Sequence, residues 1–230
     1  MTTKTTIIVT LLSARMILLG HSFGGFLSAQ YSLVYPDRLE KLVLADPWGM
    51  LDRPEDIHDK IAERWNISLA PFRRGIGFRF IFAIATRINP LGVMRAAGPY
   101  GPRLSRRMRP DLAKKFVPLL GEDDSSLMSD YLYHCNAHKA EGEAAFSRLS
   151  RDLFWAKTPM MSQLKGRQSK VPCSLLLGED SWIARDQLEE FSTWSRDLGL
   201  GIEIIPEAGH HIYADQPELF NQLVIGIISR

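Results

Sequence analysis

The chain has 230 residues, the length of one ordinary domain, and its 45% apolar and 23% charged residues suit a soluble, folded protein. The net charge of +2 at pH 7 favours no class of partner by itself. Two cysteines, Cys135 and Cys173, make no disulfide framework, and we expect both to be buried thiols in a reducing compartment. No run of residues approaches the roughly 18–20 apolar positions that a membrane-spanning helix needs.

The first residues could be taken for a secretion signal, because Ile7–Leu12 is apolar. This stretch is short, and Arg15 separates it from the next apolar run. That next run, Met16–Leu19, is needed as a core strand. We therefore expect that the chain is not secreted.

Short apolar runs alternate with helical segments along the rest of the chain. Met16–Leu19 predicts a buried strand that ends at Gly20, and Gly25–Tyr35 predicts a helix closed by Pro36. The later elements predicted are the strands Leu39–Ala45, Val171–Leu177 and Ile202–Ile205 and the helices Asp186–Leu198 and Pro217–Ile228. This alternation indicates an α/β fold with a mostly parallel sheet.

The pattern changes between residues 50 and 170, where arginines, prolines and aromatic residues are frequent and the helical segments are broken. We interpret this stretch as an inserted helical cap over the C-terminal ends of the strands. Residues 1–49 and 171–230 then form the α/β core.

The strongest motif is Gly20-His21-Ser22-Phe23-Gly24-Gly25, which follows a predicted strand and precedes a predicted helix. In this context G-x-S-x-G forms a nucleophile elbow, a tight and strained turn that exposes the serine. Gly20 and Gly24 are expected to let the neighbouring chain pass, and the N–H of Phe23 to donate to a developing oxyanion. An incidental serine in a glycine-rich turn is the alternative, and the flanking strand and helix argue against it.

A serine hydroxyl needs a base, and in this fold the chain order is serine, acid, histidine. His210 follows the last predicted strand and the small pair Ala208-Gly209, so we predict that it is the base, with His211 as the second choice. Two solvated histidines in a surface loop remain the alternative.

The acid is predicted in the loop after the strand Val171–Leu177. Asp180 is the best placed carboxylate there, and it would hold the tautomer of the imidazole and stabilise the imidazolium. Asp46, which ends the preceding strand, is the main competitor. Two further acids stay open, Glu179 and Asp186.

Several segments in combination carry a family resemblance. They are ILLGHSFGGFLSAQYSLVYPDRLEKLVLADPWG, Arg109–Asp111, Tyr131–Asn136, Trp155–Lys157 and His210–Pro217. From about Arg15 to the C-terminus they resemble a subfamily of α/β-hydrolases, the abhydrolase domain-containing proteins 4 and 5. The resemblance implies a phospholipid-metabolising protein. The expected acyl-enzyme chemistry of a serine hydrolase implies no metal or organic cofactor.

The subfamily has two branches. One resembles a lysophospholipase that acts on N-acyl phosphatidylethanolamines. The other is a lipid-droplet coactivator of a triacylglycerol lipase, to which lysophosphatidic acid acyltransferase activity is also assigned. The coactivator has asparagine at the position of Ser22, so Ser22 favours the hydrolase branch. The family often has aspartate where this chain has Ala184, and this departure leaves the acid open.

A second departure lies at the front of the chain. An α/β-hydrolase normally has several strands and an oxyanion loop of HGxG type before its elbow, whereas the elbow here begins at Gly20. Because MTTKTTIIVTLLS does not resemble the family, we expect an N-terminally truncated form that lacks the first strands. The second oxyanion donor would be missing too, a loss of about 10²–10³-fold in turnover.

His210 and Asp215 together form H-x-x-x-x-D, the pattern quoted for glycerolipid acyltransferases. A structural interpretation competes, because Asp215 and the residues after it, Gln216-Pro217-Glu218, are typical of a helix N-cap. We expect Asp215 mainly to cap the last helix, while His210 serves Ser22.

Residues 71–115 contain eleven basic residues and only one acid, Asp111. Apolar residues interleaved with them suit an amphipathic element on an anionic membrane or lipid-droplet surface. We therefore expect a cytoplasmic protein that binds such surfaces peripherally, although solvated or paired arginines on an ordinary cap are the alternative. Nucleic acid is not expected, because no binding motif accompanies the charge. The basic residues are Arg73, Arg74, Arg79, Arg87, Arg95, Arg103, Arg106, Arg107, Arg109, Lys114 and Lys115.

Overall fold

The computed structural model describes residues 15–52, 90–108, 110, 115–116, 126–137, 139–151, 155–165, 171–184 and 188–230. The chain divides into two compact units. Unit 1 comprises Met1–Asp52 and Phe154–Arg230, and unit 2 comprises Arg53–Leu153.

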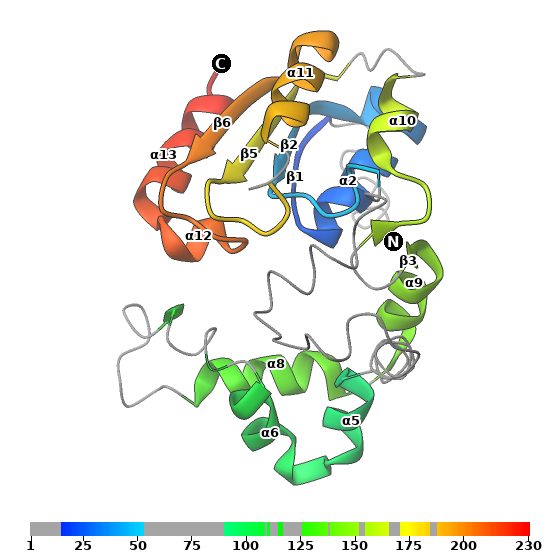
Figure 1. Ribbon diagram of the computed structural model, residues 1–230, viewed down its shortest axis with the longest axis vertical. Coiled ribbons are helices and arrows are strands. Elements are labelled where there is room, and N and C mark those ends of the chain that lie inside the picture. The colour runs from blue at the N-terminus through cyan, green and yellow to red at the C-terminus, as the bar shows by residue number, and fades with distance from the viewer. Residues whose placement is uncertain are drawn as a thin grey trace, which may run out of the picture. The chain divides into compact units, whose positions relative to one another are not determined.

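Unit 1 is built on a parallel sheet of four strands in the order β1-β2-β5-β6 (Figure 1). The strands are β1 (Met16–His21), β2 (Leu39–Ala45), β5 (Cys173–Gly178) and β6 (Gly201–Ile205). The two central strands, β2 and β5, are mainly buried, and strands covered on both faces are nearly continuous apolar runs, which is why they could be found in the sequence. The predicted α/β class with a mostly parallel sheet is confirmed.

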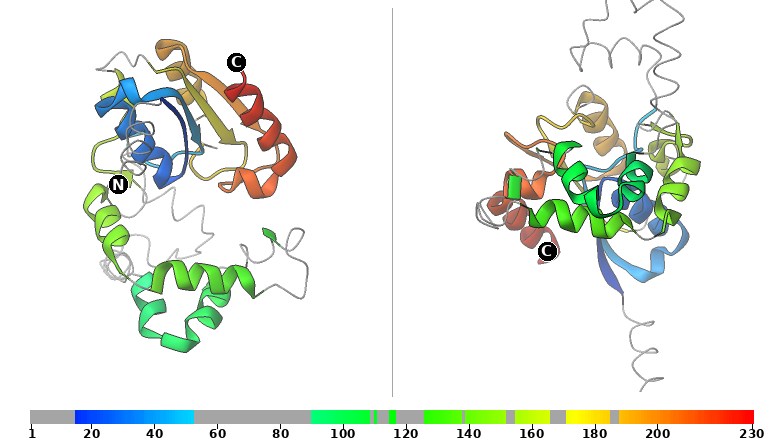
Figure 2. Two further views of the ribbon diagram at one scale, coloured as in Figure 1. Left: turned by 180° about the vertical axis from the view of Figure 1, so that it is seen from behind. Right: turned by 90° about the horizontal axis from the view of Figure 1, so that it is seen from below.

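Helices cover both faces of this sheet. Figures 1 and 2 show the strands between α2 (Phe23–Val34) and α13 (Pro217–Ile228). Pro36 follows α2 and Pro217 begins α13, in keeping with the proline preference for first helical positions and against helix interiors. The other elements of the unit are η1 (Pro36–Arg38), β4 (Trp155–Ala156), α10 (Met160–Lys165), α11 (Leu188–Leu198) and α12 (Ile212–Asp215).

The core forms on both sides of β2, because successive side chains of a strand point to opposite faces. Val43 and Ala45 pack with Leu176 and Ile205 against Phe220 of α13. On the alternate positions, Leu42 and Leu44 are also buried, and α2 contacts β1 and β2. The sheet is therefore a rigid support for the residues at its C-terminal edge.

The apolar residues of β1 are less well covered. In the described part of the chain β1 pairs with β2 alone, and Met16, Ile17 and Leu19 are each more than a third exposed. Within the described residues, β1 is therefore an edge strand of this sheet.

The predicted boundaries of the insertion, 50 and 170, move to 53 and 153. The segment after residue 153 belongs to the core because backbone N–H groups of Met160 and Met161 donate to the carbonyls of Gly49 and Met50, each at 3.0 Å. The side chain of Gln30 on α2 also donates to Gln163 at 2.9 Å. Sequence composition could not show these contacts, since they join segments more than a hundred residues apart.

The described part of unit 2 is largely helical. Its helices are α5 (Pro90–Ala96), η2 (Gly98–Tyr100), α6 (Gly101–Met108), α8 (Leu127–Ala137) and α9 (Glu141–Leu149), followed by the short strand β3 (Ser150–Arg151). Helices α5, α6 and α8 pack together. The guanidinium of Arg95 on α5 forms an ion pair with Glu143 on α9, with Nη2 to Oε2 at 2.8 Å.

The cysteine prediction is half right. Cys173, which begins β5, is of intermediate exposure as a residue, and burial of its thiol raises the pKa of that group to about 12. Cys135 is exposed on α8, so the expectation that it is buried is wrong. Among the described residues no helix combines the length and the apolar character needed to cross a membrane.

Candidate active site

Ser22 lies in the tight turn between β1 and α2 and has φ 53° and ψ −123°. Positive φ is strained for a residue with a Cβ, and it is the conformation expected of a nucleophile elbow. Backbone hydrogen bonds hold the turn, because Ser22 N–H donates to the carbonyl of Ala45 at 3.1 Å. The carbonyl of Ser22 accepts from Phe26 at 3.2 Å and from Trp48 at 3.0 Å.

The close approach in this turn occurs at Gly20 rather than at both predicted glycines. A Cβ on Gly20 would lie 2.5 Å from the carbonyl oxygen of Gly24, a distance that real Cβ atoms do not reach. A Cβ on Gly24 would meet no described atom within 4 Å. The steric role expected for the Gly24 hydrogen is therefore absent, and it is the Gly24 backbone that requires glycine at position 20.

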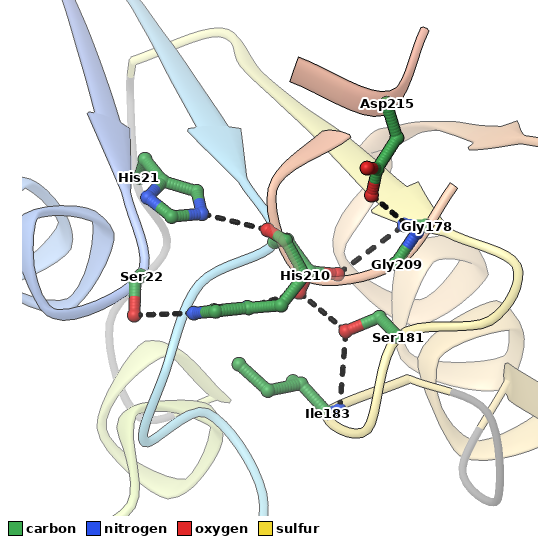
Figure 3. Close-up of polar contacts among 9 residues, drawn as sticks. His21, Ser22, Gly178, Ser181, Ile183, Gly209, His210 and Asp215 are labelled. Atoms are coloured by element: carbon green, nitrogen blue, oxygen red, sulfur yellow. Dashed lines mark hydrogen bonds and ion pairs between the residues drawn. The ribbon is translucent and has the colours of Figure 1, made fainter. Parts of the chain in front are cut away.

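The predicted base lies beside the predicted nucleophile. His210, in the loop between β6 and α12, has its Nε2 2.9 Å from Ser22 Oγ (Figure 3). His211, the second choice, is the N-cap residue of α12, and its carbonyl accepts from Ala214 and Asp215. Ser22 and His210 are 188 residues apart in sequence, and the parallel sheet brings them to one edge.

The acid beside His210 is Asp46, the competitor, and not Asp180. His210 Nδ1 lies 2.6 Å from Asp46 Oδ2, and Asp46 directly follows β2. Since a carboxylate faces Nδ1, that nitrogen carries the proton, and Nε2 accepts from the Ser22 hydroxyl. Asp180 is exposed, and its backbone N–H donates to the carbonyl of Ala208 at 2.9 Å.

The remaining candidate acids have other places. Glu179 Oε2 accepts from the backbone N–H of Glu207 at 3.2 Å. Asp186 lies outside the described residues. Asp180 and Glu179 thus tie the loop after β5 to the loop that carries His210, without facing the imidazole.

Asp46 is fully buried, and three donors compensate its carboxylate for the lost water. Its Oδ1 accepts from Gly178 N–H at 3.2 Å, and its Oδ2 accepts from Ser181 Oγ at 2.5 Å besides His210. Ser181 Oγ in turn accepts from Ile183 N–H at 3.2 Å. The sequence analysis missed Ser181 and Gly178. The sequence could have indicated them only through their position at and just after the end of β5, the strand that pairs with β2.

Asp215 does not cap the last helix, which corrects the main role predicted for it. The N-cap residue of α13 is Gln216, and Asp215 Oδ2 instead accepts from Gly209 N–H at 2.9 Å. Asp215 is the last residue of the short helix α12, a turn that the sequence did not reveal, and from there its carboxylate reaches back to the loop.

His21, between Gly20 and Ser22, also belongs to the site. Its Nε2 lies 2.8 Å from the carbonyl oxygen of His210, and its ring centroid lies 4.7 Å from that of His210. Burial lowers the pKa of His21 below its usual value. A neutral ring here adds no positive charge beside an imidazolium on His210.

Phe23, the predicted oxyanion donor, is the first residue of α2, at the end of the helix where the dipole is positive. The predicted lack of a second donor concerns residues before Arg15, which lie outside the described residues. Among the residues that the structure describes, no group of three or more histidine, cysteine, aspartate or glutamate side chains is arranged to hold a metal ion.

Comparison with known proteins agrees with this geometry. The model of the alpha/beta hydrolase family matches residues 6–223. The chain belongs to this family. Among solved structures, a thermophilic esterase from Thermogutta terrifontis has the same fold, with a TM-score of 0.55 at 21% identity over 97% of this chain and 68% of the esterase.

Two curated relatives match the two branches of the resemblance. The chain is 39% identical over 215 residues to the human "(Lyso)-N-acylphosphatidylethanolamine lipase", covering 91% of this chain and 57% of that protein. It is 40% identical over 210 residues to the mouse "1-acylglycerol-3-phosphate O-acyltransferase ABHD5", covering 91% and 56%. The chain therefore spans a little over half the length of these relatives.

The elbow geometry predicts opposite effects for its two glycines. Gly20→Ala should lower the free energy of unfolding by about 1–3 kcal/mol, because the methyl group overlaps the Gly24 carbonyl. Gly24→Ala should leave stability unchanged or raise it by up to about 1 kcal/mol, since position 24 is helical and open. Urea unfolding of both variants measures this difference, and equal losses would contradict the assigned contact.

Proposed function

We propose that the protein is a serine hydrolase that cleaves acyl esters or amides of phospholipids through an acyl-enzyme. One observation carries the proposal: the continuous chain of hydrogen bonds from Ser22 to His210 to Asp46, at 2.9 and 2.6 Å. A nucleophile, an oriented base and a buried acid in this order form the triad of serine hydrolases.

In the proposed mechanism, His210 Nε2 takes the proton of Ser22 as Oγ attacks the acyl carbonyl. The Phe23 N–H at the start of α2 donates to the oxyanion. The imidazolium is stabilised by Asp46 and gives its proton to the leaving alcohol or amine. Water, activated by the same histidine, then releases the acid.

Phospholipid substrates are supported by the name of the human relative and by the apolar surroundings of the triad. The rings of Phe23 and Trp48 lie 5.7 Å apart, and the Trp182 ring lies 5.3 Å from that of His210. Such rings suit an acyl chain better than a polar substrate. The name of the mouse relative favours one further possibility, acyl transfer, in which a lysophospholipid hydroxyl replaces water in the second step.

We further propose that the protein acts at an anionic membrane or lipid-droplet surface from the cytoplasmic side. Arg103, Arg106 and Arg107 are exposed on α6 and line a hollow of about 580 Å³ together with Tyr100. Their spacing of three and four residues gives them one helix face. Arg95 is paired with Glu143 and does not belong to this group, and Arg73, Arg74, Arg79, Arg87, Arg109 and Lys114 lie outside the described residues.

The nucleophile is tested with a fluorophosphonate probe and a soluble short-chain ester. Ser22→Ala should abolish labelling, and His210→Ala should lower the rate of labelling and of hydrolysis by about 10⁴–10⁶-fold, because the two residues act as a unit. His211→Ala should have a mild effect, since the imidazole beside Ser22 is that of His210. Hydrolysis that persists in Ser22→Ala would refute the serine mechanism.

Two matched substitutions test the acid. Asp46→Asn should lower kcat by about 10⁴-fold, because the amide cannot hold the proton on Nδ1 of His210. Asp180→Asn should leave kcat nearly unchanged, because Asp180 is exposed and the carboxylate at His210 Nδ1 is that of Asp46. The kcat of both variants is measured on the soluble ester. A larger loss in Asp180→Asn than in Asp46→Asn would contradict Asp46 as the acid and favour Asp180, in the loop after β5.

A third comparison tests the α6 arginines on vesicles that contain anionic phospholipid. Changing Arg103, Arg106 and Arg107 to Gln should weaken binding about fivefold for each residue at low salt, and less at high salt. Hydrolysis of the soluble ester should stay the same. A control variant with the same loss of charge changes three exposed arginines on other elements, Arg38, Arg151 and Arg196, to Gln. Equal weakening in both variants would contradict a specific role for α6.

A further inference from the structure

We propose that His21 and Asp215 form a clamp that holds the backbone on both sides of the His210 side chain, so that both are positioning residues for the base. The inference rests on the proposed hydrolase function, in which His210 is the base. It assigns a role to one residue of the elbow and to the acid of the H-x-x-x-x-D motif.

Asp215 holds the side of the loop that precedes His210. Its Oδ2 accepts from the backbone N–H of Gly209 at 2.9 Å, and Gly209 is the residue directly before His210 (Figure 3). The carbonyls of Ala208 and Gly209 also pass so close to Gly178 that a Cβ there would lie 2.5 Å from each oxygen. The loop therefore packs against Gly178 at the end of β5 and is hydrogen-bonded to Asp215 of α12.

His21 holds the backbone on the C-terminal side of the His210 side chain. A carbonyl oxygen only accepts, so His21 Nε2 must carry the proton that it donates to His210 O at 2.8 Å. His21 lies on one side of His210 and the contact between Asp215 and Gly209 on the other (Figure 3). Because His21 directly precedes Ser22, it ties the backbone of the base to the backbone of the nucleophile.

The loop has no regular structure of its own, and its hydrogen bonds with Asp180 and Glu179 hold its start, at Ala208 and Glu207. Residues 206–211 lie between β6 and α12 outside any helix or strand. The ring contacts with Ser22 and Asp46 orient the imidazole, but they do not fix the backbone that carries it. A displacement of about 1 Å of a catalytic group is enough to lower turnover about 100-fold.

The clamp also explains the spacing of the H-x-x-x-x-D motif. His211 caps α12, and Asp215 is the last residue of that single turn. The carboxylate of Asp215, five residues after His210, therefore lies within hydrogen-bond distance of the backbone N–H of Gly209, the residue before His210. The motif serves the geometry of the base whether the acyl acceptor is water or a lysophospholipid.

The test compares removal of each contact with a substitution that preserves it. His21→Phe keeps a ring but removes the donor, whereas Gln places an amide N–H near the position of Nε2. Asp215→Leu removes the acceptor, whereas Asn keeps an oxygen. Exposed residues of the same kinds provide the controls, His134→Phe on α8 and Glu218→Gln on α13.

On the full chain with a soluble short-chain ester, His21→Phe and Asp215→Leu should each lower kcat by about 10–100-fold with KM unchanged. His21→Gln and Asp215→Asn should restore most of the loss, and the two controls should match the wild type. Full activity in His21→Phe and Asp215→Leu would overturn the clamp. So would losses that follow the melting temperature and are not restored by Gln and Asn.

A second measurement does not depend on catalysis. The imidazole proton that His210 Nδ1 shares with Asp46 should give a downfield NMR resonance that broadens in the Phe and Leu variants and sharpens again with Gln and Asn. An unchanged resonance in all variants would also overturn the clamp. If the wild type shows the resonance but neither labels with fluorophosphonate nor hydrolyses esters, the proposed function fails while the clamp is still judged by the spectra.

Discussion

The fully buried carboxylate of Asp46 is the centre on which the rest of the site depends. Burying a charge costs several kcal/mol of free energy unless hydrogen-bond donors replace the lost hydration. The segments that supply donors to Asp46 must therefore lie next to its carboxylate. Gly178 at the end of β5, Ser181 in the loop after it, and His210 before α12 all donate to this one group. Each of these segments is therefore held in place by the same electrostatic requirement that orients the base.

The strained conformation of Ser22 is supported by the same region. Its N–H donates to Ala45, the residue before Asp46, and its carbonyl accepts from Trp48. Gly20 allows the first turn of α2, at Gly24, to pass close to the end of β1. The conformational cost of positive φ at the nucleophile, about 1–3 kcal/mol, is offset by hydrogen bonds to the strand that also supplies the acid.

Much of the fold and part of the site could be predicted from the sequence. The strands were apparent because they are apolar on both faces, and Ser22 and His210 because an elbow motif and chain order determine their places. The acid was misassigned because Asp46 and Asp180 both follow strands at the same edge, and only the path of the His210 loop decides between them. The capping role predicted for Asp215 was wrong because α12 is a single turn and leaves no periodic pattern in the sequence. The steric role predicted for Gly24 was wrong because a motif does not show which of its two glycines is crowded.

The position of Asp46 directly after β2 also affects how Ser22, His210 and Asp46 come together during folding. Ser22 and Asp46 are 24 positions apart, each directly after one of the neighbouring strands β1 and β2, so the first fifth of the chain could bring them together early. His210 is 164 residues beyond Asp46 and arrives only when β5 and β6 have paired. Contacts of such sequence separation form late and slowly. A nascent or partly folded chain would thus present a serine and a carboxylate without the histidine, and the three side chains would come together only with the last long-range pairing.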